Sequence, residues 1–171
     1  ACFETVEAIN KNPKRVHAIA WPLIQLYYSA FFGAHAICRS FGVICSQLES
    51  KQTNAIAKQA KATLSQVSHP VNGFYAFTFD ISLRTVTARL LDDSHADLWA
   101  EFNRLMSKLS TDVLITVAQS RVKMDASGLF SEINAILKQG GANKGNWLSR
   151  IRNQLNYQKS HGAWYPYKKT N

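Results

Sequence analysis

The last third of the chain holds the residues best suited to chemistry, because cations and aromatic rings alternate there without any opposing carboxylate. After Glu132 the sequence has no Asp or Glu and seven basic residues, namely Lys138, Lys144, Arg150, Arg152, Lys159, Lys168 and Lys169. The rings between them are Trp147, Tyr157, Trp164, Tyr165 and Tyr167. Basic groups neutralise phosphates, and flat rings stack on unpaired bases. The pattern predicts a surface for single-stranded RNA that includes Lys144, Arg150, Lys159, Trp164, Lys168 and Lys169; the alternative is packed rings and solvated cations.

Within this region, residues 149–157 suggest a helix with one polar flank. At 100° per residue, Leu148, Ile151 and Leu155 share an inward face. Ser149, Arg152, Asn153 and Asn156 then cluster beside that face. An arginine next to amides offers fixed hydrogen-bond donors, which suit a phosphate or a sugar hydroxyl. An ordinary solvated helix face is the alternative.

Two segments resemble HEPN domains, which are helical bundles found in bacterial toxins, abortive-infection proteins and CRISPR ribonucleases. The first is the run YYSAFFGAHA at 27–36, and the second is Arg152-Asn153 on the late helix. The resemblance covers about 16–46 and 128–165. It implies RNA cleavage without a metal, in which Arg152 binds the scissile phosphate and Asn153 orients it. It also implies a homodimer, with the sites of two protomers in one cleft.

The late motif departs from the HEPN pattern, which has a histidine after four to six residues that follow the arginine. Here Tyr157 stands after four intervening residues, and His161 comes only after eight. Tyrosine has a pKa near 10 and histidine one near 6.5, so histidine suits proton transfer at neutral pH better. His161 could serve if the chain turns back at Gly162. Either His161 or Tyr157 is therefore the candidate proton-transfer group.

Three functions remain open on this evidence. The first is a metal-independent endoribonuclease of a bacterial defence or toxin system. The second is a HEPN-like module that binds nucleic acid or dimerises without cutting, with Tyr157 at the histidine position. The third is a helical interaction protein whose basic tail meets an acidic partner such as an antitoxin.

Composition predicts one globular, soluble, cytoplasmic domain spanning 1–171. The chain is 46% hydrophobic and 18% charged, and its net charge of +9 attracts polyanions. The uncharged stretch 18–34 is periodic and shorter than the roughly twenty residues of a membrane span, so we expect a core helix and no membrane insertion. Three cysteines without a CxxC pair, and the absence of HExxH, phosphate-loop or dinucleotide motifs, predict no metal and no cofactor.

These groups should be positioned by a mainly-α fold, a helical bundle with a small β-hairpin inserted at about 74–91. Apolar residues at steps of three and four predict a helix over roughly 14–46, with Leu23, Leu26, Tyr27, Ala30, Phe31, Ala34, Ile37, Cys38 and Phe41 inward. Residues 47–68 are polar and alanine-rich, which is typical of a solvated helix or of a mobile connection. Aromatic and β-branched runs at 74–79 and 82–91 predict strands. Ser94 and Asp97 predict a capping box before the next helix. Later helices are expected over about 128–139, with Leu129 and Ile136 inward, and over 147–159.

Overall fold

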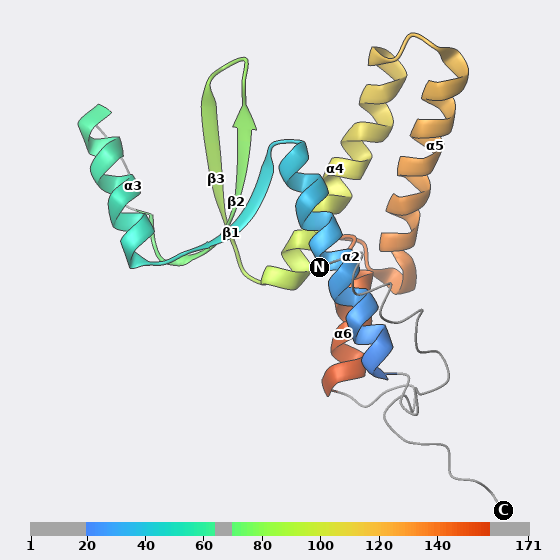
Figure 1. The fold of residues 1–171 in the computed structure, drawn as a ribbon, viewed down its shortest axis with the longest axis horizontal. Coiled ribbons are helices and arrows are strands. Elements are labelled where there is room, and N and C mark those ends of the chain that lie inside the picture. Colours follow the sequence, from blue (N-terminus) through green and yellow to red (C-terminus); the bar gives the residue numbers. More distant parts are fainter. Residues whose placement is uncertain (1–19, 64–69, 158–171) are drawn as a thin grey trace, which may run out of the picture.

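The computed structural model describes residues 20–63 and 70–157. Its elements follow in the order α2 (Ala20–Ser40), β1 (Val43–Leu48), α3 (Ser50–Thr63), β2 (Gly73–Asp80), β3 (Thr85–Leu91), α4 (Ser94–Thr116), α5 (Ser120–Leu137), the short 3-10 helix η2 (Gln139–Gly141) and α6 (Trp147–Tyr157). The mainly-α class with a small β insertion is confirmed (Figure 1). No helix in this part of the chain has the length and apolar character that a bilayer crossing requires.

The first predicted helix is too long at its carboxyl end. It ends at Ser40, and Gly42 adopts a φ of +76°, a left-handed conformation that favours glycine. The Gly42 carbonyl accepts a hydrogen bond from Phe79 N at 3.1 Å, which directs the following residues onto β2. Val43–Leu48 therefore form a strand, and the predicted hairpin is part of a three-stranded antiparallel sheet in the order β1-β2-β3.

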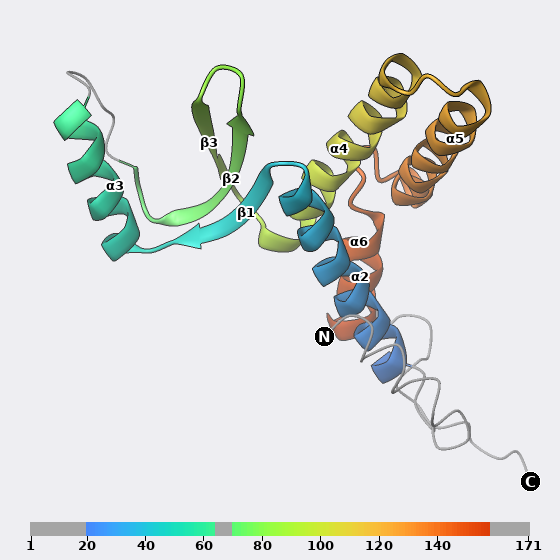
Figure 2. The same cartoon turned by 45° about the horizontal axis from the view of Figure 1, so that its top comes forward.

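The predicted hairpin itself is confirmed as β2 and β3, which pair from Phe74↔Leu91 to Asp80↔Thr85. Asp80 organises the turn, because its Oδ1 accepts hydrogen bonds from Ser82 Oγ at 2.6 Å and from Leu83 N at 2.9 Å. The turn end of the β2–β3 hairpin projects away from the helices, with α3 beyond the hairpin (Figure 2). The polar segment after β1 is the helix α3, which buries Thr53 and Ala57.

The core lies where α2 and α4 meet one face of the sheet. Its fully buried members include Cys38 and Cys45, whose thiols are free, and burial raises the pKa of Cys38 to about 12. The apolar stripe of α2 is narrower than predicted, since Leu23, Leu26, Ala30, Ile37 and Phe41 are exposed. The residues of α2 that are buried are Ala20, Ile24, Tyr27, Ser29, Phe31, Ala34 and Cys38.

Helices α4 and α5 form an antiparallel pair at one end of the molecule (Figure 1). α5 begins at Ser120, earlier than predicted. Leu129 and Ile136, predicted to point inward, are exposed. Part of the contact with α4 is polar instead, since Asn134 Nδ2 donates to Ser107 Oγ at 2.5 Å and Ser127 Oγ donates to the Ser110 carbonyl at 2.8 Å.

Candidate functional site

Arg152 lies on α6 where that helix packs against α2. Its Nη2 donates to the Tyr28 hydroxyl at 3.0 Å, and its Nη1 donates to Asn153 Oδ1 at 2.9 Å. The guanidinium carbon is 5.9 Å from the ring centroid of Tyr28 and 5.4 Å from that of Tyr157, distances at which a cation and a ring attract. These neighbours hold a half-buried cation in one place, whereas a surface arginine samples many rotamers.

The charge of Arg152 is secure at all physiological pH values. Burial lowers the pKa of Arg152, but the hydrogen bond to Tyr28 and the nearby phenols outweigh that effect, so the pKa ends above its ordinary value. The guanidinium Nε is buried and makes no hydrogen bond within the described residues. Asn153 and Tyr28 thus engage one N–H group on each Nη atom, while the Nε–H has no partner among the described residues.

Beside Arg152, a chain of hydrogen bonds leads from α2 to an imidazole on α4. The Tyr27 hydroxyl lies 2.8 Å from His95 Nδ1 and accepts a hydrogen bond from Trp99 Nε1 at 3.2 Å. Burial raises the pKa of Tyr27 to about 12, so its hydroxyl is protonated. The ring centroids of Tyr28 and His95 are 5.9 Å apart, so the Arg152–Tyr28 pair and the Tyr27–His95 pair lie side by side.

His95 owes its position to the start of α4. The helix cap is Asp93, one residue before the predicted Ser94, and Asp93 Oδ1 accepts hydrogen bonds from the backbone of His95 at 2.8 Å and of Ala96 at 2.6 Å. Asp97 Oδ2 accepts a hydrogen bond from Asp93 N at 3.0 Å, which is the role of Asp97 in the predicted capping box. Burial and the positive charge of Arg152 lower the pKa of His95, so the imidazole stays neutral to a lower pH than an ordinary histidine does.

The structure therefore places a histidine that the sequence did not single out, His95, near Arg152. His161, together with Lys159, Trp164, Lys168 and Lys169, lies outside the described residues and stays a prediction. No local pattern pointed to His95, because Tyr27 and His95 are separated by 68 positions. Of the other predicted site residues, Asn153 and Tyr157 do contact Arg152.

A groove of about 340 Å³ runs between α2 and α6 next to Arg152. Arg152 is the one charged residue among those that line it, which are Leu23, Leu26, Tyr27, Ala30, Trp147, Leu148, Ile151, Arg152 and Leu155. Leu23 and Leu26, predicted to be core residues, are exposed because they open onto this groove. A mainly apolar recess with one fixed polar group at its edge is typical of small-ligand sites.

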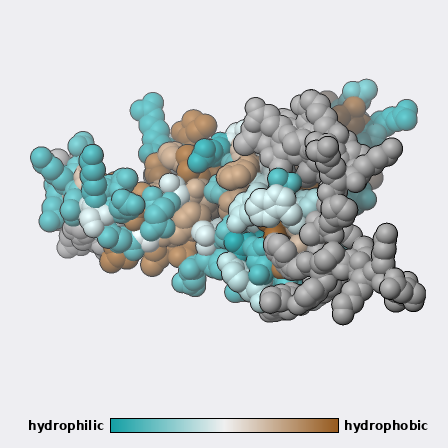
Figure 3. All heavy atoms as spheres, turned by 60° about the horizontal axis from the view of Figure 1, so that its bottom comes forward, coloured by the Kyte–Doolittle hydropathy of each residue, from teal (hydrophilic) through white to brown (hydrophobic). Residues whose placement is uncertain are grey.

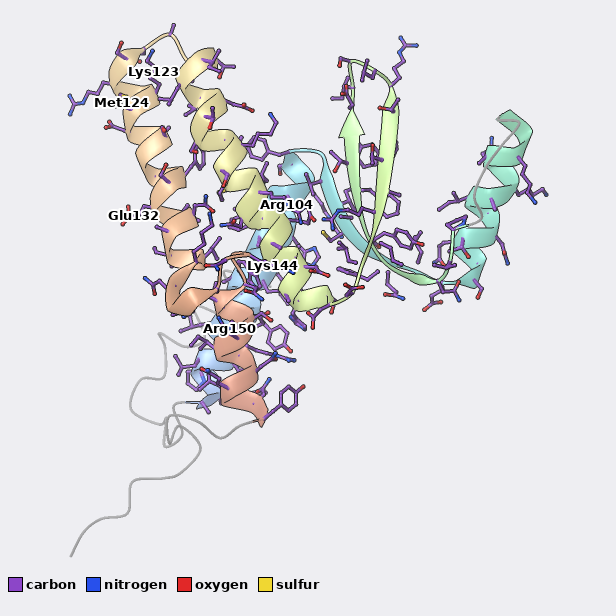
Figure 4. All side chains as sticks on the ribbon, turned by 180° about the vertical axis from the view of Figure 1, so that it is seen from behind. Arg104, Lys123, Met124, Glu132, Lys144 and Arg150 are labelled. Carbon is purple, nitrogen blue, oxygen red and sulfur yellow. The ribbon has the colours of Figure 1, made fainter. Side chains whose placement is uncertain are left out.

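Of the six residues predicted to bind RNA, Lys144 and Arg150 lie in the described part of the chain, so the surface as a whole stays a prediction. Arg150 and Arg152 are two positions apart on α6, so their side chains leave the helix about 200° from each other. Arg150 is exposed and donates to the Gly140 carbonyl at 3.1 Å, while Lys144 is exposed in the loop before α6. Arg104 on α4, Lys144 and Arg150 follow one another from α4 to α6 (Figure 4). Ser149, predicted to lie on the polar flank, is buried.

Comparison with models of protein families, with curated proteins and with solved structures finds no match to this chain. Residues 20–63 and 70–157 contain no group of three or more His, Cys, Asp or Glu that could hold a metal ion.

Proposed function

We propose that this chain is a HEPN-like, RNA-directed domain that binds a phosphodiester at Arg152 and cleaves RNA without a metal. The observation that carries the proposal is the fixed cation of Arg152 at the edge of an apolar groove, 3.0 Å from the Tyr28 hydroxyl and beside the Tyr27–His95 pair. The groove can take a base while the guanidinium neutralises the adjoining phosphate.

Cleavage of this kind is attack of a ribose 2′-hydroxyl on the neighbouring phosphorus, with departure of the 5′-oxygen of the next nucleotide. The attacking hydroxyl loses a proton and the leaving oxygen gains one, so a group that titrates near neutral pH is needed. His95 lies beside Tyr28, and because burial lowers its pKa the imidazole is neutral at pH 7 and able to accept the proton of the attacking hydroxyl. His161 and Tyr157 remain the alternatives that the sequence suggests.

The test is cleavage of a fluorescent single-stranded RNA in the presence of EDTA. We expect products ending in 2′,3′-cyclic phosphate from the unaltered chain and none from Arg152→Ala. Arg121→Ala is the matched control, because it removes the same side chain from the exposed start of α5, and it should retain cleavage. A DNA strand of the same sequence should stay intact, since it lacks the 2′-hydroxyl. Equal cleavage by Arg152→Ala would remove Arg152 from the site.

A second candidate is a module that binds RNA without cutting it. It is favoured by the contacts of Arg152 with Tyr28, Asn153 and Tyr157, which leave the guanidinium fewer free donors than an open phosphate site offers. Salt-dependent retention of RNA with no products over long incubation would select this candidate. Failure to retain RNA at all would exclude both.

A further inference from the structure

The outer strand β3 has an unprotected edge. It pairs with β2 alone among the described strands, and every residue from Thr85 to Leu90 is exposed. Proteins usually protect such edges with proline, lysine or a bulge, because unpaired N–H and C=O groups recruit other strands. β3 has no proline and no lysine, its register with β2 is continuous, and its one charged residue, Arg89, is held by Glu101.

The same strand presents apolar side chains on one face. Val86 is 56% exposed and Leu90 is 48% exposed, and Ala88 lies between them on that face. Their partners on β2 are Phe79, Phe77 and Tyr75, so apolar residues continue across the sheet. Hydrophobic surface gathers over the sheet region, between the hydrophilic α3 and the helical part (Figure 3). Edge and face together form a surface suited to another strand.

We infer that β3 pairs antiparallel with β3 of a second copy of this chain, with a two-fold axis at Ala88. In this register Val86 lies opposite the partner's Leu90, and Thr87 lies opposite the partner's Arg89. Arg84 in the turn just before β3 and the partner's Asp92 just after β3 then come to the same end of the paired strands, and symmetry repeats this opposite-charge pair at the other end. A register centred on Thr87 instead places Arg84 opposite the partner's Leu90 and loses both pairs. The charges therefore select a second copy in one register.

The test is sedimentation equilibrium of the full chain over a range of concentrations. We expect a monomer–dimer equilibrium, with Val86→Lys and Leu90→Lys each raising the dissociation constant at least about tenfold. These side chains are exposed, so circular dichroism should show an unchanged fold. Ile115→Lys is the matched control, since Ile115 is 80% exposed near the end of α4 and should leave the equilibrium unchanged.

Charge reversal tests the register itself. Arg84→Glu and Asp92→Arg should each weaken the dimer, and the double variant should restore it, because the opposite charges then face each other again. A chain that stays monomeric at all concentrations, or a dimer indifferent to these substitutions, would overturn the inference. Pairing through β3 requires nothing of Arg152, so its failure leaves the proposed RNA site untouched, and loss of RNA cleavage leaves the dimer untouched.

Discussion

At the scale of single residues, the Tyr28 hydroxyl decides where the Arg152 guanidinium lies. Tyr28→Phe keeps the ring and removes the oxygen that accepts from Nη2. We expect RNA affinity to fall several-fold, because Arg152 must then be ordered during binding, while the free energy of unfolding falls by about 1 kcal/mol. Fluorescence anisotropy with labelled RNA and urea denaturation measure the two quantities.

The matched control for this substitution is Tyr75→Phe, which removes a hydroxyl that donates to the Val71 carbonyl at 2.8 Å on the sheet. It should lower stability by a similar amount and leave RNA affinity unchanged. If both variants bound RNA equally well, Tyr28 would have no role in positioning Arg152.

Two partly buried histidines make the free energy of unfolding decrease as the pH falls. Burial lowers the pKa of both His95 and His35 below the ordinary 6.5. Each therefore binds fewer protons in the folded protein than in the unfolded chain, and protonation favours unfolding. We expect the free energy of unfolding to be level above pH 6.5 and to fall as the pH drops from 6.5 towards the lowered values.

Urea denaturation at a series of pH values checks this dependence. His95→Asn retains a polar atom near the Tyr27 hydroxyl but cannot titrate, so the decline should become shallower. His35→Asn should remove a separate part of the decline in the free energy of unfolding. The His35 ring packs 4.8 Å from that of Phe31, and its buried Nδ1 has no hydrogen bond in the described residues. A decline of unchanged steepness in both variants would contradict the assignment.

At the scale of elements, the loop between α5 and α6 is fixed by a close contact at Gly145. Its φ is +79°, and a β-carbon there would meet Asn103 Cγ at 2.6 Å. Gly145→Ala adds this overlap to the cost of a left-handed backbone, so we expect a loss of about 3 kcal/mol in urea denaturation.

Gly141→Ala separates the two causes. Its φ is +72°, but nothing lies within 4 Å of an added β-carbon, so the expected loss is about 1 kcal/mol from the backbone alone. Equal losses at the two positions would show that α4 does not restrain the loop.

The sheet is joined to α4 through the Glu101 carboxylate. This buried group binds Arg89 on β3 and Arg104 Nη2 on its own helix, the latter at 2.6 Å. Glu101→Gln leaves both arginines without their counter-charge. Because the arginine side chains are about half exposed, we expect a loss of about 2 kcal/mol, less than for a fully buried pair.

Hydrogen exchange should also quicken in β3 of the Glu101→Gln variant, since the strand loses its tie to the helix. Asp112→Asn is the comparison, because it breaks the exposed pair with Lys108 and should cost less than about 0.5 kcal/mol. Unchanged exchange in β3 would indicate that the sheet is held by its apolar contacts alone.

At the scale of the whole molecule, the net charge of +9 predicts RNA binding that weakens with salt. The slope of log affinity against log salt should shrink by about 0.7 for each phosphate contact removed from a single strand. Lys144→Ala and Arg150→Ala should each produce this change in a titration at several salt concentrations. Lys58→Ala on the distant α3 should not, and an equal effect there would indicate binding by bulk charge only.

The sequence determined what depends on neighbours along the chain. Periodicity predicted the helices, the runs around Asp80 predicted the hairpin, and the absence of acidic residues after Glu132 marked the basic region. These features follow from backbone preferences and side-chain spacing, which a few consecutive residues fix.

Only the tertiary structure decided which distant residues meet. Val43–Leu48 became a strand because Gly73–Thr78 offered it a partner about thirty positions away, and Leu23 and Leu26 became groove residues because α6 lies beside α2 without covering them. His95 joined Tyr27 across 68 positions in the same way. Contacts of this kind depend on how whole elements pack, and a local pattern carries no information about the packing partner.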